Sequence, residues 1–425
     1  MTTTAITNAT VVTVDAQGSV LERATVIVEG ATITAVLPEG SDSPTGADVV
    51  VDAAGGIVHP GLVNAHTHLA MTPFRGYADD LDLQAFLDRL LPAEGRMLSA
   101  EHVRIGARLA HLEALTSGTT SALDMYWWSD ESLAEAQRSG LRLATGPIFI
   151  GFEGPDHTAF DRRLERARTS APHAWLFAHG TYTMDPGQLR AVVDLAAELG
   201  TRFHIHASEN HSEVDDVRAR FGRSPIELLD DVGALRPGTV LAHAVVLDDD
   251  EVGRIAETGT AVAHCPSSNL KLASGVCRVP ELLAAGVTVG LGTDGPSSSN
   301  DLDMYIAMRM AGLIHKGLRG DATTMPAHAI VRMATLDGAR ALGIDHLVGS
   351  IEVGKRADLV LLDAASPSLV PVFDPHAAIA YSASRADVTD VWVDGRRVVE
   401  RRRCVTIDAD STLRAVRDEA ARIDT

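Results

Sequence analysis

The chain has 425 residues, 45% of them hydrophobic, which suffices for two or three ordinary domains or for one large α/β barrel with an accessory domain. Its formal net charge of −20 argues against nucleic acid or an anionic membrane as a partner, because phosphate binding needs clustered Lys and Arg. Three cysteines without a C-x-x-C pair, and no stretch typical of a secretory signal or membrane span, predict a reduced cytoplasmic protein.

Short runs rich in Val, Ile and Thr open the chain and return only near its C-terminus. Such runs are typical of β-strands. They lie at residues 9–14, 24–28, 32–36, 357–362 and 391–399. We therefore expect residues 1–56 and 349–425 to form one small β-sandwich domain built from both termini.

Between these ends, strand-like and helix-like stretches alternate. The expected strands are at 57–66, 119–124, 141–150, 174–183, 201–208, 239–246, 261–266 and 287–293. Helix-like stretches lie at 101–117, 185–199, 248–257 and 301–317. Strands and helices alternating in this number predict a (β/α)8 barrel over residues 57–348. A doubly wound sheet is the alternative, but no glycine-rich phosphate loop follows the first strand.

The first of these strands ends in two histidines, His66 and His68. Side chains at i and i+2 of a strand point to the same face, so both imidazoles should project side by side. An isolated H-x-H pair is weak evidence for a metal site, and core packing is its more ordinary meaning. The value of this pair depends on the strand endings that follow it.

Three later strands end in residues that could share a metal ion with this pair. His206 and then Glu209 end the fifth strand, His243 ends the sixth, and Asp294 follows the last. Taken alone, a terminal Asp is more often a cap and a histidine is more often a core residue. Together at the C-terminal ends of barrel strands, three histidines and a carboxylate would bind a divalent ion and leave a position for water.

With this ordered series, the chain resembles the amidohydrolase superfamily, and within it the methylthioadenosine/S-adenosylhomocysteine deaminase family. The motifs that carry the resemblance are Pro60 to His68, His206 to Glu209, Leu241 to Ala244, Asn269 to Gly275 and Gly292 to Gly295. The resemblance implies one divalent metal ion, zinc in most members with iron(II) as the alternative. Its ligands would be His66, His68, His206 and Asp294.

The resemblance also implies roles for the catalytic residues. Asp294 would take a proton from the attacking water and deliver it to the departing ammonia. Glu209 would protonate the ring nitrogen of the substrate, and His243 would hold the attacking oxygen by a hydrogen bond. The fourth strand ends in Ala178-His179-Gly180, without a lysine that could carry a bridging carboxylate, so one metal ion is expected rather than two.

Residues that contact the substrate follow from the same resemblance. Glu94 matches a glutamate that binds the ribose diol, since a carboxylate can accept two hydroxyl hydrogen bonds; a solvated charge at a helix end is the other interpretation. His179 resembles a histidine near the nucleoside. Arg163 would match an arginine near the sugar or the amino-acid tail, or would be a surface arginine. Pro147 stands where some members have a second arginine, which leaves the tail of the substrate open.

Two further histidines are expected close to the site. His204 shares a strand face with His206, and we expect it inside the barrel, below the metal ion. His264 ends the seventh strand and is expected near the pocket as a supporting residue.

The predicted function is metal-dependent hydrolytic deamination of an aminopurine nucleoside of the adenosine, methylthioadenosine or S-adenosylhomocysteine type. One alternative keeps the same site for another heteroaromatic ring (guanine, a pterin or an s-triazine), as a deaminase or chlorohydrolase. Another is a metal-bearing barrel that only binds its ligand. Glu94 favours the nucleoside, and Glu209 beside a metal ion argues against a pure binding protein. The expected partner is a small molecule, and the sequence leaves open whether the chain forms a homo-oligomer.

Overall fold

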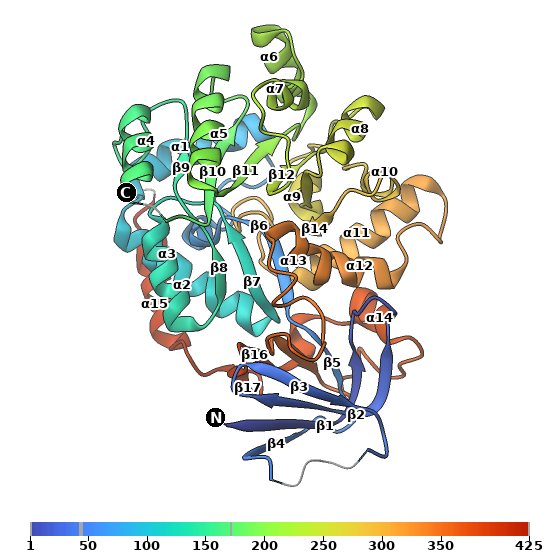
Figure 1. Ribbon diagram of the computed structural model, residues 1–425. Coiled ribbons are helices and arrows are strands. Elements are labelled where there is room, and N and C mark those ends of the chain that lie inside the picture. Colours follow the sequence, from blue (N-terminus) through green and yellow to red (C-terminus); the bar gives the residue numbers. More distant parts are fainter. Residues whose placement is uncertain (1, 42–45, 171, 424–425) are drawn as a thin grey trace.

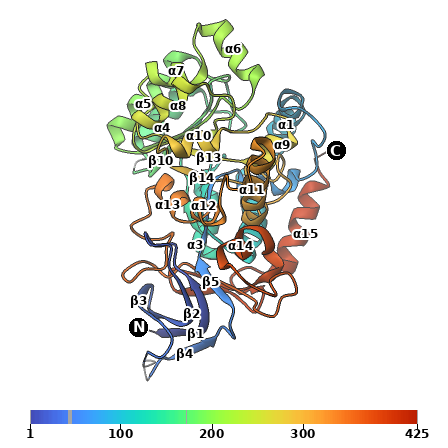
Figure 2. The same cartoon turned by 90° about the vertical axis from the view of Figure 1, so that its right-hand side faces the viewer.

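The computed structural model describes residues 2–41, 46–170 and 172–423 of the chain. Strands from both ends of the chain lie together at one end of the molecule, and parallel strands with their helices form the rest (Figures 1 and 2). The fold is therefore mixed α/β, with parallel sheets in the middle of the sequence.

One nine-stranded sheet contains strands from both termini, in the order β18-β17-β16-β15-β5-β1-β2-β3 with β4 beside β1. The strands are β1 Thr3–Val12, β2 Val20–Glu29, β3 Thr32–Leu37, β4 Val49–Asp52, β5 Ile57–Pro60, β15 Leu359–Leu362, β16 Val388–Val393, β17 Arg396–Glu400 and β18 Arg403–Cys404. The two ends of the chain meet where β5 pairs antiparallel with β15. Ile6, Val26 and Ile33 belong to the buried apolar cluster of this sheet.

Two parallel sheets form the other region, in the orders β6-β7-β8 and β9-β10-β11-β12-β13-β14. Their strands are β6 Leu62–Thr67, β7 Thr119–Asp124, β8 Arg142–Ala144, β9 Ile148–Phe149, β10 Trp175–Gly180, β11 Arg202–Ala207, β12 Thr239–His243, β13 Ala261–His264 and β14 Val289–Leu291. Every residue of β6, β7 and β12 is buried, as is usual for parallel strands whose two faces are both covered.

Two strands that the sequence predicts as continuous are divided in the structure. The expected strand 57–66 is interrupted at Gly61, so that β5 joins the terminal sheet and β6 joins the parallel one. Gly61 donates its N–H to the Asp358 carbonyl, whereas the N–H of the next residue, Leu62, reaches the Gly118 carbonyl. A Cβ at Gly61 would lie 2.1 Å from Thr120 Oγ1, so only glycine fits at this change of partners. The expected strand 141–150 is likewise divided into β8 and β9.

Helices follow most of the parallel strands. They are α1 Leu83–Met97, α2 Ala100–Thr116, α3 Ser129–Ser139, α4 Phe160–Thr169, α5 Pro186–Leu199, α6 His211–Phe221, α7 Pro225–Asp231, α8 Asp249–Glu257, α9 Pro266–Lys271, α10 Val279–Ala284, α11 Met304–Arg319, α12 Ala327–Met333, α13 Leu336–Leu342, α14 Pro375–Ala377 and α15 Ala409–Ala420, with short turns η1 Leu69–Phe74, η2 Ala378–Ser382 and η3 Arg385–Asp387. The predicted starts at Asp185 and Asp248 are confirmed as capping boxes. Within the described residues, no helix is both long and apolar enough to cross a membrane.

The C-terminal helix α15 is an element that the strand-like texture near the C-terminus does not predict. It lies along α2 of the parallel region, where His102 Nδ1 and Glu419 Oε1 are 2.8 Å apart (Figure 1). The chain therefore returns from the terminal sheet to cover a helix of the region that carries the parallel strands.

The end of β14 is bound to the end of β6, although the two strands belong to separate sheets. The Asp294 N–H donates to the His66 carbonyl at 3.0 Å, and the Asn64 side chain donates to Thr293 Oγ1 at 2.7 Å. A Cβ at Gly292 would lie 2.8 Å from the His66 carbonyl oxygen, so glycine permits this close approach. The first and last parallel strands thus bring their C-terminal ends together.

Candidate metal centre and pocket

Four potential metal ligands converge at the C-terminal ends of three parallel strands. His66 Nε2 lies 3.2 Å from His206 Nε2, and Asp294 Oδ1 lies 3.3 Å from His66 Nε2 and 3.2 Å from His68 Nε2. Ligand atoms around a tetrahedral ion with bonds of about 2.0–2.1 Å are separated by roughly 3.3 Å. The three distances match this spacing, and His66 belongs to two groups whose ligand atoms lie close enough to hold an ion, one with His68 and Asp294 and one with His206 and His243.

Hydrogen bonds behind the rings leave metal-facing lone pairs on two of the histidines. His204 Nδ1 faces the Val240 carbonyl at 2.8 Å and must carry a hydrogen there, so its Nε2 accepts from His66 Nδ1 at 2.8 Å. His68 Nδ1 donates in the same way to the Met125 carbonyl. The Nε2 atoms of His66 and His68 are then both acceptors. The expectation that His204 lies buried beneath the ligands is confirmed.

The lone pairs on His66 Nε2 and His68 Nε2 would repel the Asp294 carboxylate that they face, unless a positive charge lies between them. The pKa shifts reflect this demand: burial lowers the pKa of His68, but the hydrogen bond and charge of Asp294 outweigh it and raise that pKa. Burial raises the pKa of Asp294, but the two histidines hold it well below its usual value. The donor set of three imidazoles and one carboxylate thus fits a borderline divalent ion such as zinc.

Two serines fix the Asp294 carboxylate. Ser268 Oγ and Ser298 Oγ donate to Oδ2 at 2.6 and 2.9 Å, and the Gly295 N–H donates to Oδ1 at 2.7 Å. Oδ1 remains the oxygen that faces the histidines. Sequence reasoning missed both serines, because a hydroxyl that bonds a distant carboxylate has no spacing or periodicity of its own.

His243 is oriented by Asn269 on α9. With the amide as it stands in the structure, Asn269 Nδ2 donates to His243 Nδ1 at 2.9 Å, so the ring hydrogen resides on Nε2. His243 Nε2 lies 3.7 Å from Glu209 Oε2. His243 has a φ of 73°, a strained conformation of the kind that clusters at functional sites. Although its ring lies beside His66 and His206, its Nε2–H makes it a hydrogen-bond donor in the pocket rather than a metal ligand.

We expect Asn269→Asp to lower kcat by about 10²–10⁴-fold while bound metal is retained. The carboxylate has nearly the shape of the amide but would take a hydrogen from His243 Nδ1, which turns Nε2 into an acceptor. Steady-state kinetics and metal analysis would measure this, with Ser274→Ala as the control, because the buried Ser274 hydroxyl has no hydrogen-bond partner. Unchanged kcat in Asn269→Asp would contradict the assigned tautomer.

Glu209 is held at the pocket by a second buried glutamate. Glu213 accepts the backbone N–H groups of Ser208 and Glu209 at 3.2 and 2.6 Å and the Thr181 hydroxyl at 2.6 Å. Burial raises the pKa of Glu209 well above its usual value, and the charges of Asp294 and Glu213 add to this shift. The raised pKa favours the protonated form of Glu209. The sequence analysis did not identify Glu213.

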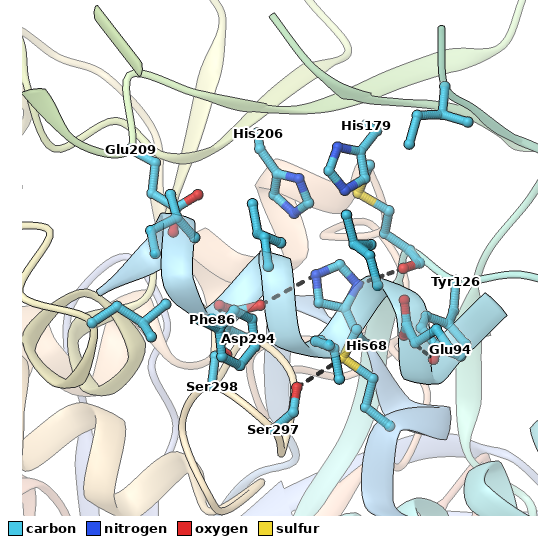
Figure 3. Close-up of a pocket in the computed structure, with 18 of the residues that line it drawn as sticks. His68, Phe86, Glu94, Tyr126, His179, His206, Glu209, Asp294, Ser297 and Ser298 are labelled. Carbon is cyan, nitrogen blue, oxygen red and sulfur yellow. Dashed lines mark hydrogen bonds and ion pairs between the residues drawn. The ribbon is translucent and has the colours of Figure 1, made fainter. Parts of the chain in front are cut away.

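Three of the candidate ligands, His68, His206 and Asp294, line a pocket. Figure 3 shows Glu209 and Asp294 on one side of His68, and Glu94 with Tyr126 on the other. Glu94 is only 3% exposed, accepts a hydrogen bond from the Tyr126 hydroxyl, and has its pKa raised by burial to about 7. The interpretation of Glu94 as a solvated helix-end charge is therefore wrong.

His179 and Arg163 differ in their relation to this pocket. His179 lines it, with its ring centroid 5.3 Å from that of His206. Arg163 does not line it: the guanidinium lies over the ring of Trp127, at 5.0 Å, and forms two hydrogen bonds with Asp156. Because its charge is already paired on the far side of a pocket wall, this geometry does not support substrate contact by Arg163.

His264 also lies outside the lining. It is buried, with its ring centroid 5.6 Å from that of His315 on α11. Neither ring nitrogen of His264 has a hydrogen-bond partner among the described residues. No hydrogen bond therefore supports the expectation that His264 holds a pocket residue in place.

A parallel α/β fold whose strand ends gather histidines and an aspartate around one point defines the class of this protein. The amidohydrolase family pattern matches residues 57–398, so the chain belongs to the amidohydrolase family and is a hydrolase. It is 42% identical over 383 residues, 89% of each chain, to a 5-methylthioadenosine/S-adenosylhomocysteine deaminase of Desulforudis audaxviator.

Two further comparisons cover nearly the whole chain. A 5′-deoxyadenosine deaminase of Methanosarcina acetivorans is 38% identical over 424 residues, which is 98% of this chain and 97% of that one. A crystal structure of an adenosine deaminase from Xanthomonas campestris with bound zinc superposes with a TM-score of 0.95 at 35% identity, covering 99% of this chain and 98% of that one.

Proposed function

We propose that this protein is a metal-dependent deaminase that hydrolyses the amino group of an adenosine-type nucleoside and releases ammonia. The observation that carries the proposal is the pairing of two buried carboxyl groups with different partners in one pocket. Glu209 lies beside the metal ligands, where a purine amino group would react, and Glu94 lies apart from them with an oxygen free to accept sugar hydroxyls. A free base or a triazine would bring Glu94 no hydroxyl beyond that of Tyr126. The relatives' names support the same substrate class.

His66, His68, His206 and Asp294 would hold one zinc ion, which when bound lowers the pKa of a water molecule toward neutrality. Asp294 Oδ1 would accept a proton from the attacking water, while Ser268 and Ser298 keep the carboxylate in place through Oδ2. The proton would then pass to the departing amino group, which leaves as ammonia.

Glu209 and His243 would act on the ring nitrogen and on the attacking oxygen, respectively. As water adds to the reacting carbon, Glu209 would donate its proton to the neighbouring ring nitrogen, which requires the protonated form that burial favours. Glu209 would regain a proton from the attacking oxygen as ammonia leaves and the carbonyl forms. The His243 Nε2–H would donate a hydrogen bond to the attacking oxygen and hold it on the line of attack. His179 would lie against the substrate because it lines the pocket. It would be neutral there, because burial lowers its pKa to about 3.

We also propose that the two parallel sheets are parts of one (β/α)8 barrel over residues 57–348, with β8 and β9 sharing one strand position. The hydrogen bond between Asp294 and His66 supports this closure, because it joins the last strand to the first. Residues 1–56 and 349–425 would form the accessory β domain, a proposal that the sheet shared by both termini supports. The two-layered sandwich form of that domain stays a prediction.

The nucleoside substrate can be tested through Glu94. We expect adenosine to be deaminated with a kcat/KM about 10–100-fold higher than that of 2′,3′-dideoxyadenosine, because loss of the diol removes hydrogen bonds to a buried carboxylate that then has only the Tyr126 hydroxyl among its described partners. This preference should weaken as the pH falls below about 7, since protonation of Glu94 removes the acceptor. Glu94→Ala should lower the rate with adenosine and reduce the difference between the two substrates.

Ammonia release measured across purine bases, nucleosides and s-triazines gives the matching control. A wild-type enzyme that treats adenosine and its dideoxy analogue equally, or that prefers a free base, would contradict the nucleoside assignment. Deamination of none of these compounds would contradict the proposed reaction itself.

A further inference from the structure

Many apolar side chains line the pocket away from the proposed metal ligands. They include Leu83, Phe86, Leu90, Met125, Trp127 and Ile150. Glu94, on α1, is the ionisable group at the sugar end, and it carries a negative charge when ionised. No Lys or Arg occurs among the described residues that line this pocket.

An outer cavity shares the residues around Glu94 with the pocket. Leu91, Glu94, Trp127 and Ile150 line both, and the outer cavity adds the half-exposed Phe152. Its other ionisable groups are Glu153 and His157, which form an ion pair with each other at 3.0 Å; no Lys or Arg is among the described lining residues here either. A substituent that extends from a ribose bound at Glu94 meets apolar walls whether it stays in the pocket or follows this cavity outward.

Two cations near these walls, Arg163 and Lys271, are already held by carboxylates, and Arg96, beside the outer-cavity residue Gly95, donates to the Pro92 carbonyl. Arg163 lies behind Trp127 and is bound by Asp156 on both of its terminal nitrogens. Lys271, next to the lining residue Leu272, donates to Asp79 at 2.6 Å and also to Asn300. Recruiting either side chain to a substrate carboxylate would require an existing ion pair to be broken.

We propose that this site takes adenosine-type nucleosides whose 5′ substituent is uncharged, such as hydrogen or an alkylthio group, and rejects those that carry a zwitterionic amino-acid tail. The proposal rests on the proposed function above and narrows its substrate class. Its physical basis is desolvation: a carboxylate that enters an apolar wall without a cationic partner loses its hydration and gains nothing in return. A methylthio group gains from the same apolar surface.

The test compares three nucleosides that differ only at the 5′ position: 5′-methylthioadenosine, 5′-butylthioadenosine and S-adenosylhomocysteine. The butylthio compound matches the length of the amino-acid tail without its charges, so it separates charge from size. We expect kcat/KM for both alkylthio compounds to exceed that for S-adenosylhomocysteine on the order of 100-fold. Equal values for all three, or equal losses for the two long tails, would overturn the proposal.

A variant tests the missing cation directly. Phe152→Arg places a positive charge at a half-exposed position of the outer cavity, and Phe152→Met is its neutral control. The arginine should raise kcat/KM for S-adenosylhomocysteine about tenfold relative to the methylthio compound, and the methionine should leave that ratio unchanged. An unchanged ratio in both variants would count against the proposal. Failure of the proposed function differs from all these results, because no nucleoside would then release ammonia.

Discussion

His66→Ala should be purified with little bound metal and should show no measurable turnover. Its Nε2 atom is one of the converging donor atoms, and its neighbours are His206 Nε2 and Asp294 Oδ1, at 3.2 and 3.3 Å. Removing it leaves too few ligands for tight binding of a tetrahedral ion. His206→Ala should behave in the same way, because it supplies the same kind of donor from a different strand.

Stability provides a readout of the ligand set that does not depend on activity. A metal that binds only the folded state raises the melting temperature by mass action, so stripping the wild-type protein with a chelator should lower its Tm and adding zinc should restore it. The Tm of His66→Ala should respond much less to either treatment. His111→Gln is a suitable control, because His111 is a buried histidine that hydrogen-bonds Ser139 and does not line the pocket. Full metal occupancy in His66→Ala would remove His66 from the ligands.

The ligand positions could be predicted because two regularities of β-strands act together. The i and i+2 relation places His66 and His68 on one face, and parallel strands bring their C-terminal ends to one edge. His206 and Asp294 follow strands that are distinct in the sequence by their runs of apolar residues. The structure gathers these ends as expected, through the hydrogen bond between Asp294 and the His66 carbonyl.

Residues that support the site from outside the motifs could not be predicted. Glu213 bonds the backbone before it and Thr181 on another connection, and Ser298 bonds Asp294 across a loop. Such partners depend on how the connections fold over the strand ends, and no periodicity in the sequence records this. Arg163 shows the converse problem: its charge suggests a ligand, but Asp156, seven residues earlier, has already paired it.

The division of the expected first strand has a similar origin. Pro60 and Gly61 together are a local signal for a break, but the apolar runs before and after them were interpreted as one strand. The break occurs because the chain exchanges one partner, β15, for another, β7, and both partners lie far away in the sequence. Strand pairing between distant segments depends on the tertiary structure. The sequence therefore indicated the terminal sheet only through the similar Val-, Ile- and Thr-rich runs at both ends of the chain.

Glu209→Gln should retain its metal and lose about 10²–10⁴-fold in kcat, the usual contribution of general acid–base catalysis. The amide keeps the size of the side chain and can still hydrogen-bond a ring nitrogen, but it has no proton to transfer. KM should therefore change much less than kcat. Glu135→Gln is the matched control, because Glu135 is equally buried but is bound by Arg108 and Arg138 and does not line the pocket.

The pH dependence of the same variant distinguishes loss of a proton donor from loss of shape. Because burial and the nearby carboxylates raise the pKa of Glu209, its acid form persists to higher pH than that of an ordinary glutamate and is lost as the pH rises through that raised pKa. Wild-type kcat should consequently fall on the alkaline side, and this limb should be missing from the residual activity of Glu209→Gln. A variant with near-normal kcat, or with the alkaline limb intact, would show that the proton of the ring nitrogen comes from another group.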